Sequence, residues 1–332
     1  MITKSTKQHR RSVKKTAVAR RPFPVGKRPQ HYANVFKRAC RAAEQGQARA
    51  QCKLGMMYAK GEGVPQDYDV ALKWYRLAAE QDNALAQSTL GILYANGQGV
   101  PQDYHVALKW FRLAAMQGDA VAQRNLGILY AGGQGVTKDF QEALKWYRRA
   151  AKQDNAEAQF LLGLMYAEGE GLPKNGREAV KWFHLAAGQG IDQAQFNLGL
   201  LYAHGEGVPQ DDVQAMVWFR QAAEQGNAEA QFLLGQMYRQ GKGARRNTRQ
   251  AVQWYRRAAD QEYAEAQFSL GQMYFEGQGV PQSDEEAAKW YRRAAEQGHS
   301  NAQIRLGLMD GSGLFNLSQN AEVDATAYPQ AG

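Results

Sequence analysis

The sequence predicts an all-α fold, an α-solenoid built from stacked helix–turn–helix repeats. All seven tryptophans lie 36 residues apart, at Trp74, Trp110, Trp146, Trp182, Trp218, Trp254 and Trp290. Around them the chain repeats one pattern: A-x-A-Q-x-x-L-G-x-x-Y, then G-x-G, then A-x-x-W-[YF] and A-A. A single unit of this size cannot bury its apolar face alone, so neighbouring units have to stack.

The repeat pattern divides the chain into five segments. Seven full repeats cover residues 48–299, preceded by a half repeat at 33–47 and followed by a half repeat at 300–309. The pattern ends at Asp310, where it calls for tyrosine. Residues 1–32 are predicted to be a basic disordered tail, and residues 310–332, rich in small and polar residues, a second disordered tail.

The first helix of each repeat has recognisable ends. In the second repeat its apolar positions follow helical spacing, at Ala86, Leu90, Leu93 and Tyr94. Asn83 is a fitting N-cap for this helix. Gly97 and Gly99 accept a positive φ and are therefore expected to end it.

The second helix is predicted to begin at a side chain that caps it. The seven candidate N-caps are Asp67, Asp103, Asp139, Asn175, Asp211, Asn247 and Ser283. Five repeats carry Glu or Gln three residues later, as in a capping box: Glu142, Glu178, Gln214, Gln250 and Glu286. The buried stripe of this helix is expected to include, in one repeat, Ala107, Trp110, Phe111 and Ala114.

A glycine stands inside every first helix, although glycine there costs about 0.5–1 kcal/mol relative to alanine. The eight positions are Gly55, Gly91, Gly127, Gly163, Gly199, Gly235, Gly271 and Gly307. Their recurrence implies that a neighbouring helix approaches closely, as do the paired alanines of the second helix. We expect the indole of each repeat to fill the space beside these flat surfaces.

These motifs resemble the Sel-one-like repeat family, relatives of the tetratricopeptide repeats that are common in bacteria. The resemblance rests on A-x-A-Q-x-x-L-G-x-x-Y, G-x-G-V-P-x-D and A-x-x-W-[YF]-x-x-A-A and covers about residues 33–309. It implies a right-handed superhelix, a concave face lined mainly by first helices, and a role in protein–protein interaction, often as an adaptor.

The two cysteines do not match the cysteine-rich secreted branch of that family, which carries cysteines in every repeat. Disulfides and export are therefore not expected here. Cys40 and Cys52 lie six residues on either side of Gly46, so they could face each other across two helices. The expectation is two reduced thiols in a cytosolic protein, and pairing stays open.

The net charge of +9 belongs to the N-terminal tail. Residues 1–38 hold twelve basic and no acidic residues, whereas the remainder is slightly acidic. The tail could bind nucleic acid or an anionic surface, with Arg10, Arg11, Lys14, Lys15, Arg20 and Arg21 as the polyanion-binding residues. It could instead be an organelle transit peptide, a signal for delivery to a host, or a solubilising leader.

No secretory signal and no segment long enough to span a membrane is recognisable, so a cytoplasmic location is expected.

No catalytic constellation is recognisable, and no enzyme, cofactor or metal site is expected. An S-x-x-K pair at Ser12 and Lys15 lacks the accompanying elements of that nucleophile motif. Residues 235–242 look like a P-loop but have five residues between the glycines, where four are required. The six histidines show no spacing typical of metal ligands. A hydrolase-like activity remains an unlikely alternative.

Positions that vary between repeats are free to serve function. By analogy with tetratricopeptide repeats, two equivalent positions of the first helices, one turn apart, would line the concave face and bind a partner. We call the residues at both positions together the first-helix row: Phe160, Phe196, Phe232, Phe268, Leu164, Leu200, Gln236 and Gln272. The alternative for the phenylalanines is inter-repeat core.

A further set of equivalent positions, which we call the arginine ladder, runs along the second helices, at Arg76, Arg112, Arg148, His184, Arg220, Arg256 and Arg292. We expect these to be solvated residues near helix C-termini, able to pair with Glu80, Glu224 and Glu296. The function that the sequence favours is a non-enzymatic adaptor gripping an extended or helical peptide segment.

Overall fold

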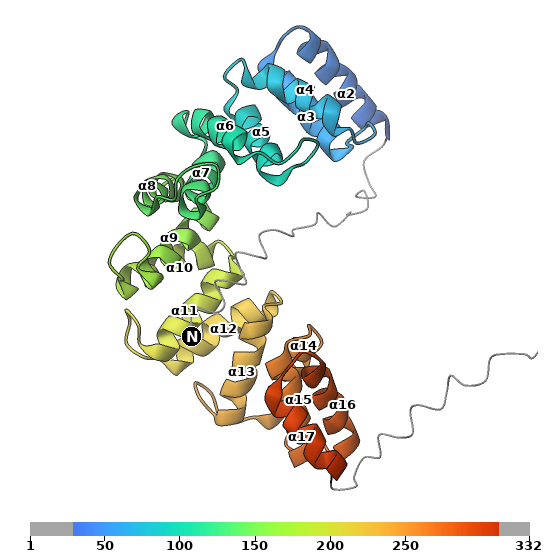
Figure 1. Ribbon diagram of the computed structural model, residues 1–332, viewed down its shortest axis with the longest axis vertical. Helices are drawn as coiled ribbons and strands as arrows, with labels where there is room; N and C mark the ends of the chain where they lie inside the picture. Colours follow the sequence, from blue (N-terminus) through green and yellow to red (C-terminus); the bar gives the residue numbers. More distant parts are fainter. Residues whose placement is uncertain (1–28, 312–332) are drawn as a thin grey trace, which may run out of the picture. The chain divides into compact units, whose positions relative to one another are not determined.

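The computed structural model describes residues 29–311, with the side chains of residues 34–309. This range contains only α-helices and no strand, which confirms the all-α prediction. The helices, labelled in Figure 1, are α2 (Pro29–Glu44), α3 (Ala48–Lys60), α4 (Tyr68–Ala79), α5 (Ala84–Asn96), α6 (Tyr104–Met116), α7 (Ala120–Gly132), α8 (Phe140–Ala151), α9 (Ala156–Glu168), α10 (Gly176–Gly188), α11 (Asp192–His204), α12 (Asp212–Glu224), α13 (Ala228–Gln240), α14 (Thr248–Ala259), α15 (Ala264–Glu276), α16 (Asp284–Glu296) and α17 (Ser300–Gly311).

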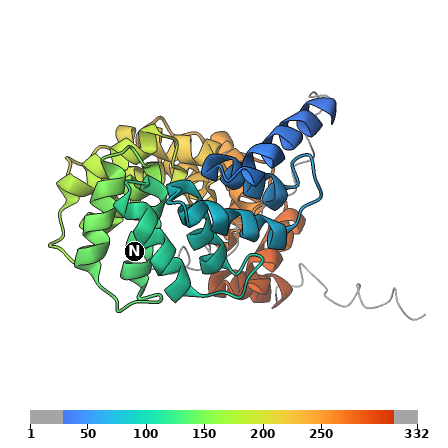
Figure 2. The same cartoon turned by 90° about the horizontal axis from the view of Figure 1, so that it is seen from above.

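The helices form two compact units that divide between Gln102 and Asp103. The first unit holds α2–α5 and the second α6–α17. Within each unit, every helix packs against the next one in sequence. Figure 2 shows this succession of helix pairs through the second unit, from green to red. Each unit is therefore a solenoid of helix–turn–helix repeats.

The outermost helices extend slightly beyond the predicted half repeats. α2 begins at Pro29, four residues before the expected boundary at 33. Proline suits the first turn of a helix because its missing N–H would be unpaired there in any case. α17 ends at Gly311, two residues beyond the expected 309.

All seven predicted N-caps of the second helices are confirmed. Each side chain accepts a hydrogen bond from a backbone N–H of the first turn; in α4, Asp67 Oδ1 lies 3.0 Å from the Val70 nitrogen. The three glutamates predicted as capping-box partners make other contacts. Glu142, Glu178 and Glu286 instead form ion pairs with lysines three residues later.

First helices end where the sequence predicts, at a glycine in the left-handed conformation. At the end of α5, Gly97 has a φ of 67° and its N–H donates to the carbonyl of Leu93. Asn83 caps the start of the same helix, with 2.9 Å between its Oδ1 and the Ala86 nitrogen. Local sequence signals therefore define both ends of this helix.

The glycine inside six of the first helices makes room for an aromatic ring of the following helix, at Gly55, Gly127, Gly163, Gly199, Gly235 and Gly271, whereas a Cβ on Gly307 would meet nothing within 4 Å. A Cβ on Gly199 would lie 2.5 Å from two ring carbons of Phe219, and one on Gly127 would lie 2.5 Å from the ring of Tyr147. The predicted close approach is confirmed, but the expectation that the indole fills this space is wrong. The ring involved belongs to the Tyr or Phe that follows each tryptophan.

Most of the indoles lie at the margin of the core. Five of the seven are only partly buried, Trp110 included, and only Trp254 and Trp290 are buried. Arginine guanidinium groups lie over the rings of Trp146, Trp254 and Trp290, at 4.6, 4.5 and 4.8 Å from their centroids. Such cation–π contacts suit a ring with one face toward solvent.

A row of buried glutamines links consecutive second helices. Its members come from the A-x-A-Q motif: Gln51, Gln87, Gln123, Gln159, Gln195, Gln231 and Gln267. Each Nε2 donates to an alanine carbonyl eight residues earlier, over 2.9–3.3 Å. Six of them accept a bond of 2.7–2.8 Å from a glutamine thirty residues later. We call this set the glutamine ladder.

Cys40 and Cys52 are free thiols. Cys52 is buried in α3, and this burial raises its pKa to about 11. Such a thiol stays protonated at neutral pH and is a poor nucleophile.

Candidate functional site

The phenylalanine rings of the first-helix row are largely buried against the next helix. Phe160 and Phe196 are each only 8% exposed, and Phe232 and Phe268 are partly buried. Their ring centroids lie 5.5–5.8 Å from rings of the next helix, those of Phe183, Phe219, Tyr255 and Tyr291. The structure therefore leaves only a small part of these four rings available to a partner.

The positions one turn later are more accessible. Leu164 on α9 and Leu200 on α11 are partly exposed at the edges of two core clusters. Gln236 on α13 and Gln272 on α15 occupy the equivalent places and are also partly exposed. The apolar members come from earlier repeats and the polar members from later ones, so this part of the first-helix row changes character along the chain.

A neighbouring first-helix position changes in the same way. Leu85 and Val121 are 50% and 37% exposed, whereas the equivalent residue in a later repeat is the exposed Glu157. Glu157 Oε1 lies 3.5 Å from Nη1 of Arg124, which is one repeat earlier.

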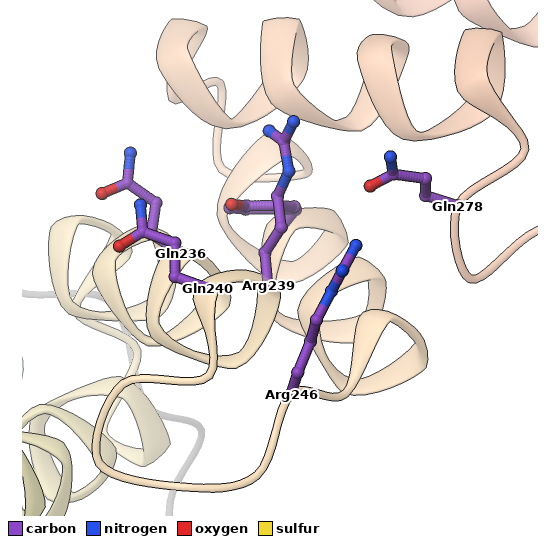
Figure 3. A pocket seen from close by; sticks show the side chains of 6 residues that line it. Gln236, Arg239, Gln240, Arg246 and Gln278 are labelled. Atoms are coloured by element: carbon purple, nitrogen blue, oxygen red, sulfur yellow. The ribbon is translucent and has the colours of Figure 1, made fainter.

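Gln236 also lines an open pocket of about 370 Å³. The other residues of the lining are Arg239, Gln240, Arg246, Tyr255 and Gln278. Figure 3 shows Arg239 extending from α13 and Arg246 from the loop that follows, with Gln278 on the other side of the space. Among the eight residues of the first-helix row, Gln236 is the one that lines this pocket.

Five arginines of the arginine ladder are exposed, as expected, but they bond to tyrosines of the next helix, and the described residues show no ion pair with Glu80, Glu224 or Glu296. Arginine Nη2 donates to the phenol oxygen of a tyrosine eighteen residues later, over 2.5–2.8 Å in the pairs Arg76–Tyr94, Arg112–Tyr130, Arg148–Tyr166 and Arg220–Tyr238. Arg256 donates to Tyr274 in the same way. The acceptor is the last residue of the L-G-x-x-Y motif, so these arginines hold a second helix to the next first helix.

His184 replaces arginine in one repeat. Its Nε2 lies 3.3 Å from the Tyr202 phenol oxygen, and burial lowers its pKa from the usual 6.5. Its ring meets that of Trp218 edge-on, with centroids 5.1 Å apart. The contacts of His184 are those of a packed residue.

No metal-binding arrangement is found among the described side chains, those of residues 34–309. Within that range no three His, Cys, Asp or Glu side chains come close enough to share a metal ion. Gly235, the start of the P-loop-like stretch, packs against the ring of Tyr255 like its equivalents. The S-x-x-K pair at Ser12 and Lys15 lies outside the described residues, as do the polyanion-binding candidates Arg10, Arg11, Lys14, Lys15, Arg20 and Arg21.

None of the helices that the structure describes is both long and apolar enough to cross a membrane.

Two features were not recognised from the sequence. The glutamine of A-x-A-Q stood in the repeat pattern, but only its contacts show that it is buried and links helices. The pocket has a detectable sequence signal, because Lys242 and Arg245 of the sixth repeat stand where the other repeats carry Glu or Gln and Pro or Thr, and Arg246 stands where they carry Gln or Lys.

Known structures of similar sequence share this architecture. A protective antigen of uropathogenic Escherichia coli that displays an SLR fold is 37% identical, with a TM-score of 0.81. The match covers 84% of this chain and 60% of that protein, so this chain spans less than two thirds of its length. A Sel1 repeat protein from Oxalobacter formigenes is 35% identical, with a TM-score of 0.68, over 86% of this chain and 83% of that one. A comparison with curated proteins found no similar sequence.

The family model for the Sel1 repeat matches eight consecutive segments, at residues 48–83, 84–119, 120–155, 156–191, 192–227, 228–263, 264–299 and 300–322. These segments follow the tryptophan spacing and cover most of the chain. The chain belongs to the Sel1 repeat family.

Proposed function

We propose that the chain is a non-enzymatic scaffold or adaptor that binds a protein or peptide segment at the first-helix row. One observation carries this proposal: the partly exposed positions of the row change between Leu and Gln from repeat to repeat, while the buried leucine two residues before them stays the same. Leu162, Leu198 and Leu234 are fully buried and identical in consecutive repeats. Two residues further on, the partly exposed row reads Leu164, Leu200 and Gln236. An accessible position that changes between repeats, next to a buried one that does not, is expected of a surface adapted to a partner.

The accessible members are Leu164, Leu200, Gln236 and Gln272, with the exposed edges of the phenylalanines beside them. Partly buried apolar side chains flanked by polar groups are suited to anchor a peptide. Phe160 and Phe196 contribute by supporting the surface from beneath, since their rings are packed against the next helix.

The test is partner capture by the full chain carrying Leu164→Glu and Leu200→Glu. A photo-crosslinking side chain placed at position 193, also on α11, records which protein lies there. We expect the double variant to lose the crosslinked species, because two carboxylates would be buried against an apolar partner. Thermal unfolding monitored by circular dichroism checks that the fold is kept.

The matched control is Val217→Glu on α12. Val217 is 43% exposed and apolar but lies on a second helix. Crosslinking is expected to survive this change. A partner captured equally well by all three proteins, or lost equally from the control, would contradict the proposal.

The charge asymmetry favours a second candidate, binding of a polyanion by the N-terminal tail. The candidate residues are Arg10, Arg11, Lys14, Lys15, Arg20 and Arg21. Tail-driven DNA affinity should fall steeply between low and moderate salt through counterion release, and should vanish when the six residues become Gln. Salt-insensitive binding, or binding that survives those changes, would exclude the tail as its cause.

A further inference from the structure

The sixth repeat carries a basic segment that the other repeats lack. Residues 239–249 include Arg239, Lys242, Arg245, Arg246 and Arg249 and no acidic residue. The equivalent segment of every other full repeat contains at least one Asp or Glu. The segment therefore concentrates positive charge at one place on a body that is otherwise slightly acidic.

Two of these arginines replace residues that the repeat pattern defines. The position of Arg239 is alanine in the five preceding repeats and Phe275 in the seventh. The position of Arg246 is glutamine or lysine in the others, for example Gln210. The fold therefore does not require arginine at either place.

The structure brings both arginines into the lining of the pocket in Figure 3, with Gln236, Gln240, Gln278 and Tyr255. All six lining residues can donate a hydrogen bond. The two guanidinium groups come from different segments, the end of α13 and the following loop. A ligand in the pocket could accept hydrogen bonds from both.

One carboxylate offsets part of the charge. Glu276 Oε2 lies 3.8 Å from Nη2 of Arg239, which is too long for a hydrogen bond. In the described part of the chain, no ion pair is formed by Arg246. The two lining arginines and this glutamate together carry about one net positive charge.

Two other lining residues, Gln278 and Tyr255, have groups that could bond to a ligand. Gln278 Oε1 is shielded from solvent and has no hydrogen-bond partner in the described structure. Rotating the side-chain amide of Gln278 by about 180° would exchange its oxygen and nitrogen and place an N–H donor at this position. Burial raises the pKa of Tyr255 to about 12, with a smaller opposing effect from Arg239, so the phenol remains protonated at neutral pH.

We propose that this pocket binds a carboxylate side chain in an acidic segment of a protein partner, with Arg239 and Arg246 as the two cationic contacts. The proposal rests on the proposed scaffold function and specifies one place and one chemistry on its surface. A net charge near one matches a carboxylate, whereas Glu276 would repel a phosphate dianion. The glutamine amides can pair with the peptide groups on either side of the acidic residue.

The experiment measures fluorescence anisotropy of a short fluorescein-labelled polyglutamate peptide with an amidated C-terminus. The protein is the full chain with the six tail residues Arg10, Arg11, Lys14, Lys15, Arg20 and Arg21 changed to Gln, which removes their contribution. The test variant adds Arg239→Ala and Arg246→Gln, residues that other repeats carry at these positions. We expect its affinity to fall at least about tenfold, because charge-assisted hydrogen bonds are lost.

The charge-matched control carries Lys73→Gln and Lys109→Gln on the same background. Both lysines are exposed on second helices, and the change removes the same two charges. Less than about a twofold effect is expected, because salt screens exposed charges at a distance. A polyglutamine peptide of equal length should not bind.

Equal binding by the test variant, or an equal loss in the charge-matched control, would overturn the pocket assignment. Tighter binding of a phosphoserine peptide, inorganic phosphate or an oligonucleotide, dependent on the same two arginines, would overturn the carboxylate assignment. Neither outcome affects the scaffold proposal, which is tested separately by the Leu164 and Leu200 changes.

Discussion

The side-chain amide of Gln225 donates a hydrogen bond of 2.8 Å to Oε1 of Gln195, thirty residues earlier in the chain. Gln195 in turn donates to the Ala187 carbonyl over 3.2 Å. One buried side chain on α11 thus connects the end of α10 with the end of α12. The same two hydrogen bonds recur along the glutamine ladder. They are directional contacts in an interface made otherwise of alanine, leucine and aromatic rings.

Because Gln195 belongs to the glutamine ladder, we expect Gln195→Ala to lower the free energy of unfolding. The change removes two hydrogen bonds, from Gln195 to the Ala187 carbonyl and from Gln225 to Gln195, and at about 0.5–1.5 kcal/mol each their loss should cost about 1–3 kcal/mol. Chemical denaturation of the two proteins measures the difference in the free energy of unfolding. Gln221→Ala on the exposed face of α12 is the control and should stay within roughly 0.5 kcal/mol. Equal costs for the two changes would show that the ladder contributes nothing specific.

Gly199→Ala should destabilise the chain by about 1–3 kcal/mol through overpacking, although alanine favours a helix. The added Cβ would lie 2.5 Å from the Phe219 ring, and the ring is held by its own core. Gly188→Ala is the matched control, because nothing lies within 4 Å of a Cβ there. That change should be neutral or stabilise by up to about 1 kcal/mol. Denaturation curves that rank the two variants in the opposite order would refute the packing explanation.

The histidine of the arginine ladder predicts a dependence of stability on pH. Burial lowers the pKa of His184 from its usual 6.5, so the unfolded chain takes up a proton at a pH where the folded chain does not. Its contribution to stability is therefore present at neutral pH and is lost as the pH falls through and below 6.5.

His184→Arg should remove this loss, since arginine stays charged and makes the Tyr contact in the other repeats. Urea denaturation between about pH 7 and pH 5 should show a steeper fall in stability for the natural chain than for this variant. Parallel curves would mean that His184 does not contribute to the pH dependence.

The repeat architecture predicts that a whole unit can be removed. Deleting residues 120–155, which hold α7 and α8, joins equivalent positions of two repeats and should leave a folded helical protein. Deleting α8 and its flanking loops alone exposes a stacking face and should unfold or aggregate the chain. Circular dichroism and thermal unfolding compare the two. Complete unfolding by both deletions would contradict nearest-neighbour stacking.

The sequence by itself determined the helices, their order and their ends. Caps such as Asp103 and Gly97 act within one turn of the backbone, so their effect can be inferred from neighbouring residues alone. The 36-residue spacing then identified which helices form a repeat and that repeats stack. The presence of glycine within the first helices also indicated close packing, although not which ring occupies the space.

Only the tertiary structure decided what each side chain touches. Gln195 meets a residue thirty positions away and Arg148 one eighteen positions away, and no local signal specifies such partners. Phe196 could have faced a groove or a neighbouring helix, and its position beside Phe219 leaves it mostly buried. The pocket at Arg239 and Arg246 likewise exists only because helix packing brings the end of α13, its loop and Gln278 together. Helix ends depend on local backbone hydrogen bonds, whereas burial and pockets depend on how distant segments pack.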